Sequence, residues 1–69
     1  MNNMTVREFL KSFVPRYATI RVLHFPETDT AADVLYDGLA KLEEIPDDVG
    51  GRIVSSIVPL SNDLYIAVY

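Results

Sequence analysis

The chain has 69 residues, 49% of them hydrophobic, with a formal net charge of −4 and no cysteine. This length predicts one small domain over residues 1–69, the composition excludes a disordered chain, and the lack of cysteine excludes disulfides and cysteine-ligated metals. No run reaches the ~18 apolar residues of a membrane-spanning helix and no signal peptide begins the chain, so we expect a cytoplasmic protein.

Residues 5–13 carry the signals of a short amphipathic helix. Thr5 and Glu8 have the spacing of a capping box, in which each side chain accepts a hydrogen bond from the other residue's backbone N–H. Four apolar side chains follow at the spacing of one helical face: Val6, Phe9, Leu10 and Phe13. Pro15 ends the helix. Because a helix this short does not persist alone in water, we expect it to pack on a sheet.

Three runs rich in β-branched and aromatic residues predict strands: Thr19–Phe25, Arg52–Pro59 and Leu64–Tyr69. The turn between the last two is Leu60–Asp63. In the last run, alternate side chains would share a face, with Tyr65, Ala67 and Tyr69 on one side and Leu64, Ile66 and Val68 on the other. Both faces are therefore apolar, which is typical of a central or doubly covered strand.

The segment 31–45 fits two structures. A helical period with Thr30 as its cap runs through Ala32, Leu35, Leu39 and Leu42, whereas Gly38 and the triplet Val34–Tyr36 favour a strand. We favour a strand with a bend or bulge at Gly38. A polar loop, Glu27–Asp33, comes before it, and a single helical turn, Pro46–Val49, comes after it. The predicted fold is α+β, with a short N-terminal helix packed on an antiparallel sheet of about four strands.

Charge is divided unevenly along the chain. Residues 1–21 carry four cations and one carboxylate, whereas residues 27–48 carry eight carboxylates and one lysine. The densest acidic group is Glu43, Glu44, Asp47 and Asp48. Such a surface is unsuited to a nucleic-acid backbone and suits a basic surface on a protein partner. The alternative is that these charges only keep the domain soluble.

Tyr65 and Tyr69 are predicted on a sheet face that one short helix cannot also cover. Tyrosine is enriched at interfaces, and a small chain without disulfides gains stability by self-association. We therefore expect a homo-oligomer, most simply a two-fold dimer through these tyrosines. In an alternative function, the oligomer sequesters a small nucleotide signal between subunits, with phosphates held by Arg16, Arg21 or Arg52 and a base stacked on a tyrosine.

The sequence contains histidine, serine and acidic residues, which act in many catalytic sites, but without the neighbouring residues that such sites require. His24 is the single histidine, and no nucleophile-elbow pattern surrounds Ser55 and Ser56. The acidic group also lacks the spacing of a calcium loop. We therefore expect no catalytic residues, no metal and no cofactor, which predicts a non-enzymatic protein.

Several short segments in succession resemble a group of small phage- and prophage-encoded proteins of uncharacterised role. These segments are Thr5–Leu10, Ile20–Val22, Val34–Gly38, Glu44–Pro46, Arg52–Val54 and Leu64–Val68. The resemblance implies a helix followed by an antiparallel sheet and supplies no catalytic residues. It also implies an accessory role, since inhibitors of bacterial defence are common among such proteins. The first functional hypothesis is thus a phage accessory protein that blocks a bacterial defence protein through its acidic surface.

Overall fold

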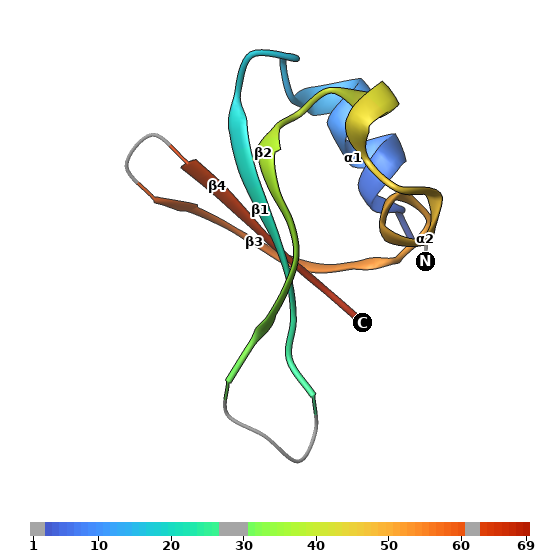
Figure 1. Ribbon diagram of the computed structural model, residues 1–69. Helices are drawn as coiled ribbons and strands as arrows, with labels where there is room; N and C mark the ends of the chain where they lie inside the picture. The colour runs from blue at the N-terminus through green and yellow to red at the C-terminus, as the bar shows by residue number, and fades with distance from the viewer. Residues whose placement is uncertain (1–2, 27–30, 61–62) are drawn as a thin grey trace.

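The computed structural model describes residues 3–26, 31–60 and 63–69 and has an α+β fold (Figure 1). Its elements follow the order α1 (Val6–Phe13), β1 (Thr19–His24), β2 (Asp33–Leu39), η1 (Leu42–Glu44), α2 (Asp47–Gly50), β3 (Val54–Leu60) and β4 (Asp63–Val68). The strands form one sheet in the order β2-β1-β4-β3. The predicted class, with an N-terminal helix and four strands, is confirmed.

The central strand pair differs from the predicted all-antiparallel sheet. β1 and β2 are antiparallel, as are β3 and β4, but β1 and β4 run parallel. The path of residues 40–53 explains this. β2 ends with Leu39 beside Thr19, whereas β3 begins with Val54 opposite Val68, which is the β4 partner of His24. The connection therefore crosses the length of the sheet, and the second hairpin returns with β4 parallel to β1.

α1 begins and ends as its sequence predicts. The Glu8 N–H donates to Thr5 Oγ1 at 3.1 Å, and the Thr5 N–H donates to Glu8 Oε1 at 3.0 Å, which completes the capping box. Val14 is extended, so the helix stops before Pro15. Of the predicted apolar stripe, Val6 and Leu10 are buried, whereas Phe13 is 67% exposed.

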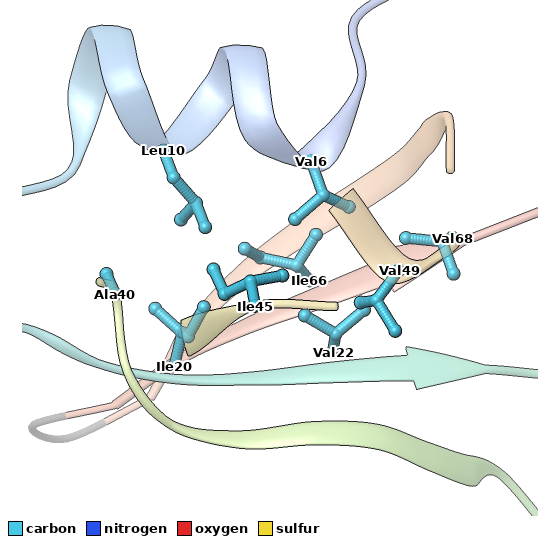
Figure 2. Close-up of a cluster of buried hydrophobic side chains, with 9 residues drawn as sticks. All are labelled: Val6, Leu10, Ile20, Val22, Ala40, Ile45, Val49, Ile66 and Val68. Carbon is cyan, nitrogen blue, oxygen red and sulfur yellow. The ribbon is translucent and has the colours of Figure 1, made fainter. Parts of the chain in front are cut away.

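The core lies between the sheet and two covering segments, α1 and the connection 40–53 (Figure 2). Val6 and Leu10 point from α1 toward side chains of β1 and β4. The buried hydrophobic residues of the described chain are Val6, Leu10, Ile20, Val22, Ala40, Ile45, Val49, Ile66 and Val68. We call the sheet face that these residues cover the inner face.

The segment 31–45 is a strand only as far as Leu39 and then forms the 3-10 turn η1. The helical alternative is wrong, and its proposed cap, Thr30, lies outside the described residues. The register shift is also not at Gly38. Val22 pairs with Tyr36 and Leu23 with Val34, so Leu35 is the extra residue. Leu35 packs against the core, and that contact accounts for the displaced bulge.

The predicted turn Pro46–Val49 is confirmed as α2, displaced by one residue: it runs Asp47–Gly50, and Pro46 is its N-cap. The described part of the predicted loop Glu27–Asp33 is residues 31–33, and its residues 27–30 lie outside the description. In the predicted turn Leu60–Asp63, residues 61–62 also lie outside the description. The two described residues of this turn are the last residue of β3, Leu60, and the first residue of β4, Asp63.

Candidate functional site

The sheet face opposite α1, which we call the outer face, carries a shallow apolar hollow. It has a volume of about 280 Å³. Side chains of β1, β3 and β4, with one residue just after β1, line it: Leu23, Phe25, Ser56, Val58, Leu60, Tyr65 and Ala67. We call it the outer hollow.

The outer hollow is uncovered because α1 and the connection 40–53, which includes η1 and α2, both lie on the inner face (Figure 1). Strand alternation then places Leu23, Tyr65 and Ala67 opposite the buried row of Val22, Ile66 and Val68. Phe25 is 54% exposed, Val58 47% and Leu60 49%. An exposed cluster of large apolar side chains on a small protein is characteristic of a binding surface.

Arg21 fixes the position of Tyr65 beside the hollow. The two residues are register partners on β1 and β4. Arg21 Nη1 donates to the Tyr65 hydroxyl at 3.2 Å, and the guanidinium carbon lies 5.3 Å from the centre of the ring. Arg21 Nη2 donates to Asp37 Oδ2, also at 3.2 Å, so the cation is neutralised within the sheet. Arg21 Nε is buried and has no hydrogen-bond partner among the described residues.

The two tyrosines predicted at an oligomer interface differ in their surroundings. Tyr65 lines the outer hollow, whereas Tyr69 does not and is 72% exposed. The Tyr69 backbone N–H donates to the Ile53 carbonyl at 3.2 Å, and its backbone oxygen accepts from Arg52 Nη1 at 3.0 Å. Tyr69 therefore ties the end of β4 to the start of β3.

The four predicted acidic residues lie on η1 and α2, beside α1. Three of them have cationic partners within the chain: Glu43 pairs with Arg16, Asp47 with Arg7 at 3.1 Å, and Glu44 with Lys41 at 3.7 Å. Asp48 has no ion-pair partner in the part of the chain that the structure describes. The basic N-terminal region and the acidic middle thus pair inside one molecule, which leaves a smaller local negative charge than the sequence predicts.

The three arginines proposed as phosphate ligands are dispersed over the molecule. Arg16 follows α1 and pairs with Glu43, Arg21 lies on the outer face with Asp37, and Arg52 contacts Tyr69. Each guanidinium is engaged in its own chain. Their arrangement supplies no shared phosphate-binding cluster within one molecule.

Among the described residues, three groups have displaced pKa values, each for a local structural reason. Hydrogen bonds from the backbone N–H and hydroxyl of Thr5 lower the pKa of Glu8. A hydrogen bond from its own backbone N–H, followed by one from Arg16, lowers the pKa of Glu43. Burial, with smaller contributions from Glu44 and Asp37, raises the pKa of Tyr36, whose hydroxyl donates to the Leu39 carbonyl at 2.7 Å. All three groups act in capping and packing, away from the outer hollow.

The other candidate residues contribute structural contacts. His24 Nδ1 lies 3.7 Å from Asp33 Oδ2 across β1 and β2. Ser55 and Ser56 are exposed on β3, and Ser56 lines the outer hollow. Within residues 3–26, 31–60 and 63–69, no group of three potential ligands is close enough to hold a metal ion. The same residues include no helix with the length and apolarity needed to cross a membrane.

Of the residues that line the outer hollow, the sequence predicts a functional role for Tyr65 alone. It predicts none for the other six: Leu23, Phe25, Ser56, Val58, Leu60 and Ala67. The sequence does show that side chains alternate between the two faces of each strand and that one short helix can cover only one face of the sheet. This predicts an uncovered face, but it does not predict which residues of β3 lie on that face. Comparisons with known proteins found no matching family model, no matching curated protein and no matching solved structure. The proposals below therefore rest on this chain's own residues.

Proposed function

We propose that this chain is a non-enzymatic binding protein whose outer sheet face receives an apolar surface of a protein partner. The outer hollow is the observation that supports this function. Its walls are apolar, and three of the residues that line it, Phe25, Val58 and Leu60, are each about half exposed. Contact with a partner would remove these side chains from water, which is the main source of binding free energy in protein interfaces.

The polar groups at the hollow suit binding to a protein. Tyr65 combines a large, rigid ring with a hydroxyl, and Arg21 holds that hydroxyl in place before any partner arrives. A side chain fixed in advance loses less conformational entropy on binding. The neutral pair Arg21–Asp37 also leaves no uncompensated charge for a partner to bury.

Simple magnitudes predict a moderate affinity. Covering a few hundred Å² of apolar surface stabilises a complex by roughly 5–10 kcal/mol at ~25 cal/mol per Å². Association itself costs about 4–15 kcal/mol in lost translational and rotational freedom. The surplus is small, so we expect a reversible complex that depends on the fit of a few side chains.

The acidic residues offer a second route to a protein partner, with less support from the structure. The pairs of Glu43 with Arg16 and Asp47 with Arg7 are exposed and weak, so a basic partner could replace the cations. Reversing the charge of Glu43, Glu44, Asp47 and Asp48 together should abolish binding if this route operates. A phage origin and a bacterial defence protein as target are hypotheses that rest on the resemblance in sequence. A cytoplasmic setting is a hypothesis that rests on the apolar runs of the sequence, which are too short for a membrane-spanning helix.

Site-specific photo-crosslinking tests the outer face directly. Benzoylphenylalanine would replace Val58 in the outer hollow, Tyr17 in the turn before β1, or Asp48 on α2, and each protein would be irradiated in a bacterial lysate. We expect adducts from position 58 that mass spectrometry maps to apolar surface residues of a protein, with only background from position 17. Equal yields from 58 and 17, or adducts from 48 alone, would reject the outer face as the binding surface.

A further inference from the structure

We propose that the occupant of the outer hollow is the outer face of a second copy of this chain, related by a two-fold axis. This inference rests on the proposed function, since it takes the outer face as the binding surface and names the partner. Three features carry it: the sheet edges, the distribution of charge and the shape of the face.

The free edge of β3 is poorly suited to pairing with another strand. At its start, the Val54 N–H donates to the Met4 carbonyl at 2.8 Å, and the Val6 N–H donates to the Arg52 carbonyl at 2.9 Å. The first residues of the chain therefore occupy this part of the edge. Toward the other end, Pro59 has no N–H to offer. Protection of this kind prevents edge-to-edge association.

The free edge of β2 is protected in a different way. It carries the charged residues Asp33 and Asp37 and the bulge at Leu35. Because neither edge is suited to strand addition, two sheets can associate only through their faces. The inner face is filled by α1 and the connection 40–53, so the outer face is the one available.

Charge favours contact between two outer faces over other arrangements of two copies. Each copy carries a net charge of −4, which opposes association. The acidic residues of η1 and α2, however, lie on the inner side of the sheet, beside α1 (Figure 1). On the outer face, Arg21 and Asp37 neutralise one another, and strand alternation adds one carboxylate, that of Asp63, the register partner of Leu60. Two outer faces can therefore meet while the acidic surfaces point away from each other.

The outer face combines a recess with exposed apolar side chains. The recess is the hollow of about 280 Å³, and Phe25 and Leu60, which line it, are each about half exposed. A two-fold axis brings the same apolar side chains of each copy against those of the other. Four strands of about six residues give a face of roughly 20 by 20 Å, on the order of 400 Å². That is less than the ~800 Å² per partner of a standard interface, so we infer a concentration-dependent dimer.

Sedimentation equilibrium from micromolar to millimolar concentration tests this dimer. The native protein should shift from monomer to dimer mass as its concentration rises. Val58→Lys and Ser56→Lys each place a charge in the hollow and should remain monomeric with an unchanged circular-dichroism spectrum. Tyr17→Lys, which changes a side chain that is 82% exposed outside the hollow, should dimerise as the native protein does.

The second-copy proposal fails if the native protein is monomeric at millimolar concentration, or if both lysine variants in the hollow dimerise normally. Its failure is distinguishable from that of the proposed function. A monomeric protein that still crosslinks from position 58 to a different protein retains the outer face as a binding surface. A monomeric protein without such adducts loses both.

Discussion

Arg7 Nη2 lies 3.1 Å from Asp47 Oδ1, and the same guanidinium lies over Gly50. A Cβ at position 50 would stand 2.8 Å from Arg7 Nη2, so a larger residue there must displace this side chain. The pair links α1 to α2 across forty positions of sequence. It shows that the opposite charges of the two halves meet within one chain.

Gly50→Ala should therefore break the Arg7–Asp47 pair at little cost. The guanidinium is the flexible end of a partly exposed side chain, so we expect a loss below about 1 kcal/mol in the free energy of unfolding. Urea unfolding would measure it. Adding Asp47→Asn to Gly50→Ala should cause no further loss, whereas an undiminished effect of Asp47→Asn would show that the pair survives.

Leu10 and Phe13 belong to the same stripe in sequence but should differ sharply in their contribution to stability. Leu10 is 1% exposed in the core, and Leu10→Ala should cost about 2–5 kcal/mol. A chain of this size has a total stability of only ~3–5 kcal/mol, so this variant should be largely unfolded. Phe13→Ala, at a residue 67% exposed, should cost about 1 kcal/mol or less. Thermal unfolding by circular dichroism would compare them, and equal losses would contradict the packing of α1.

Stability should fall on the acid side because of Glu8 and Glu43. Their folded-state pKa values lie below the ordinary value of 4.5, so between the two values the unfolded chain binds more protons. The resulting stabilisation is present above pH 4.5 and is lost as the pH falls through the folded pKa values. Glu8→Gln should flatten this part of the curve of unfolding free energy against pH. An unchanged acid slope in that variant would contradict the role of the capping box.

Local features were predictable because they depend on neighbours in sequence. The Thr5–Glu8 capping box, the end of α1 before Pro15 and the α2 turn after Pro46 all follow from residues within a few positions. The strands were predictable from their alternation of side chains. The bulge at Leu35 was not, because it depends on a contact between that side chain and the core.

Features that depend on the path of the chain through space were beyond sequence reasoning. The parallel β1–β4 pair arises because residues 40–53 cross the whole sheet, which no local pattern encodes. The same path brings Glu43 to Arg16 and Asp47 to Arg7, and so reduces the acidic surface. Likewise, strand alternation predicts Tyr65 and Tyr69 on the same face of the sheet. Only Tyr65 lines the outer hollow, because Tyr69 lies beyond the end of β4.

The accessibility of the outer face in solution tests the central claim most directly. Amide signals of the native protein would be recorded by nuclear magnetic resonance with a soluble paramagnetic probe, at low and at high protein concentration. If the outer face is the binding surface and a second copy covers it, Leu23, Val58 and Tyr65 should lose probe-induced broadening at high concentration, while Tyr17 keeps it. Broadening of the outer-face amides that does not change with concentration would contradict that account.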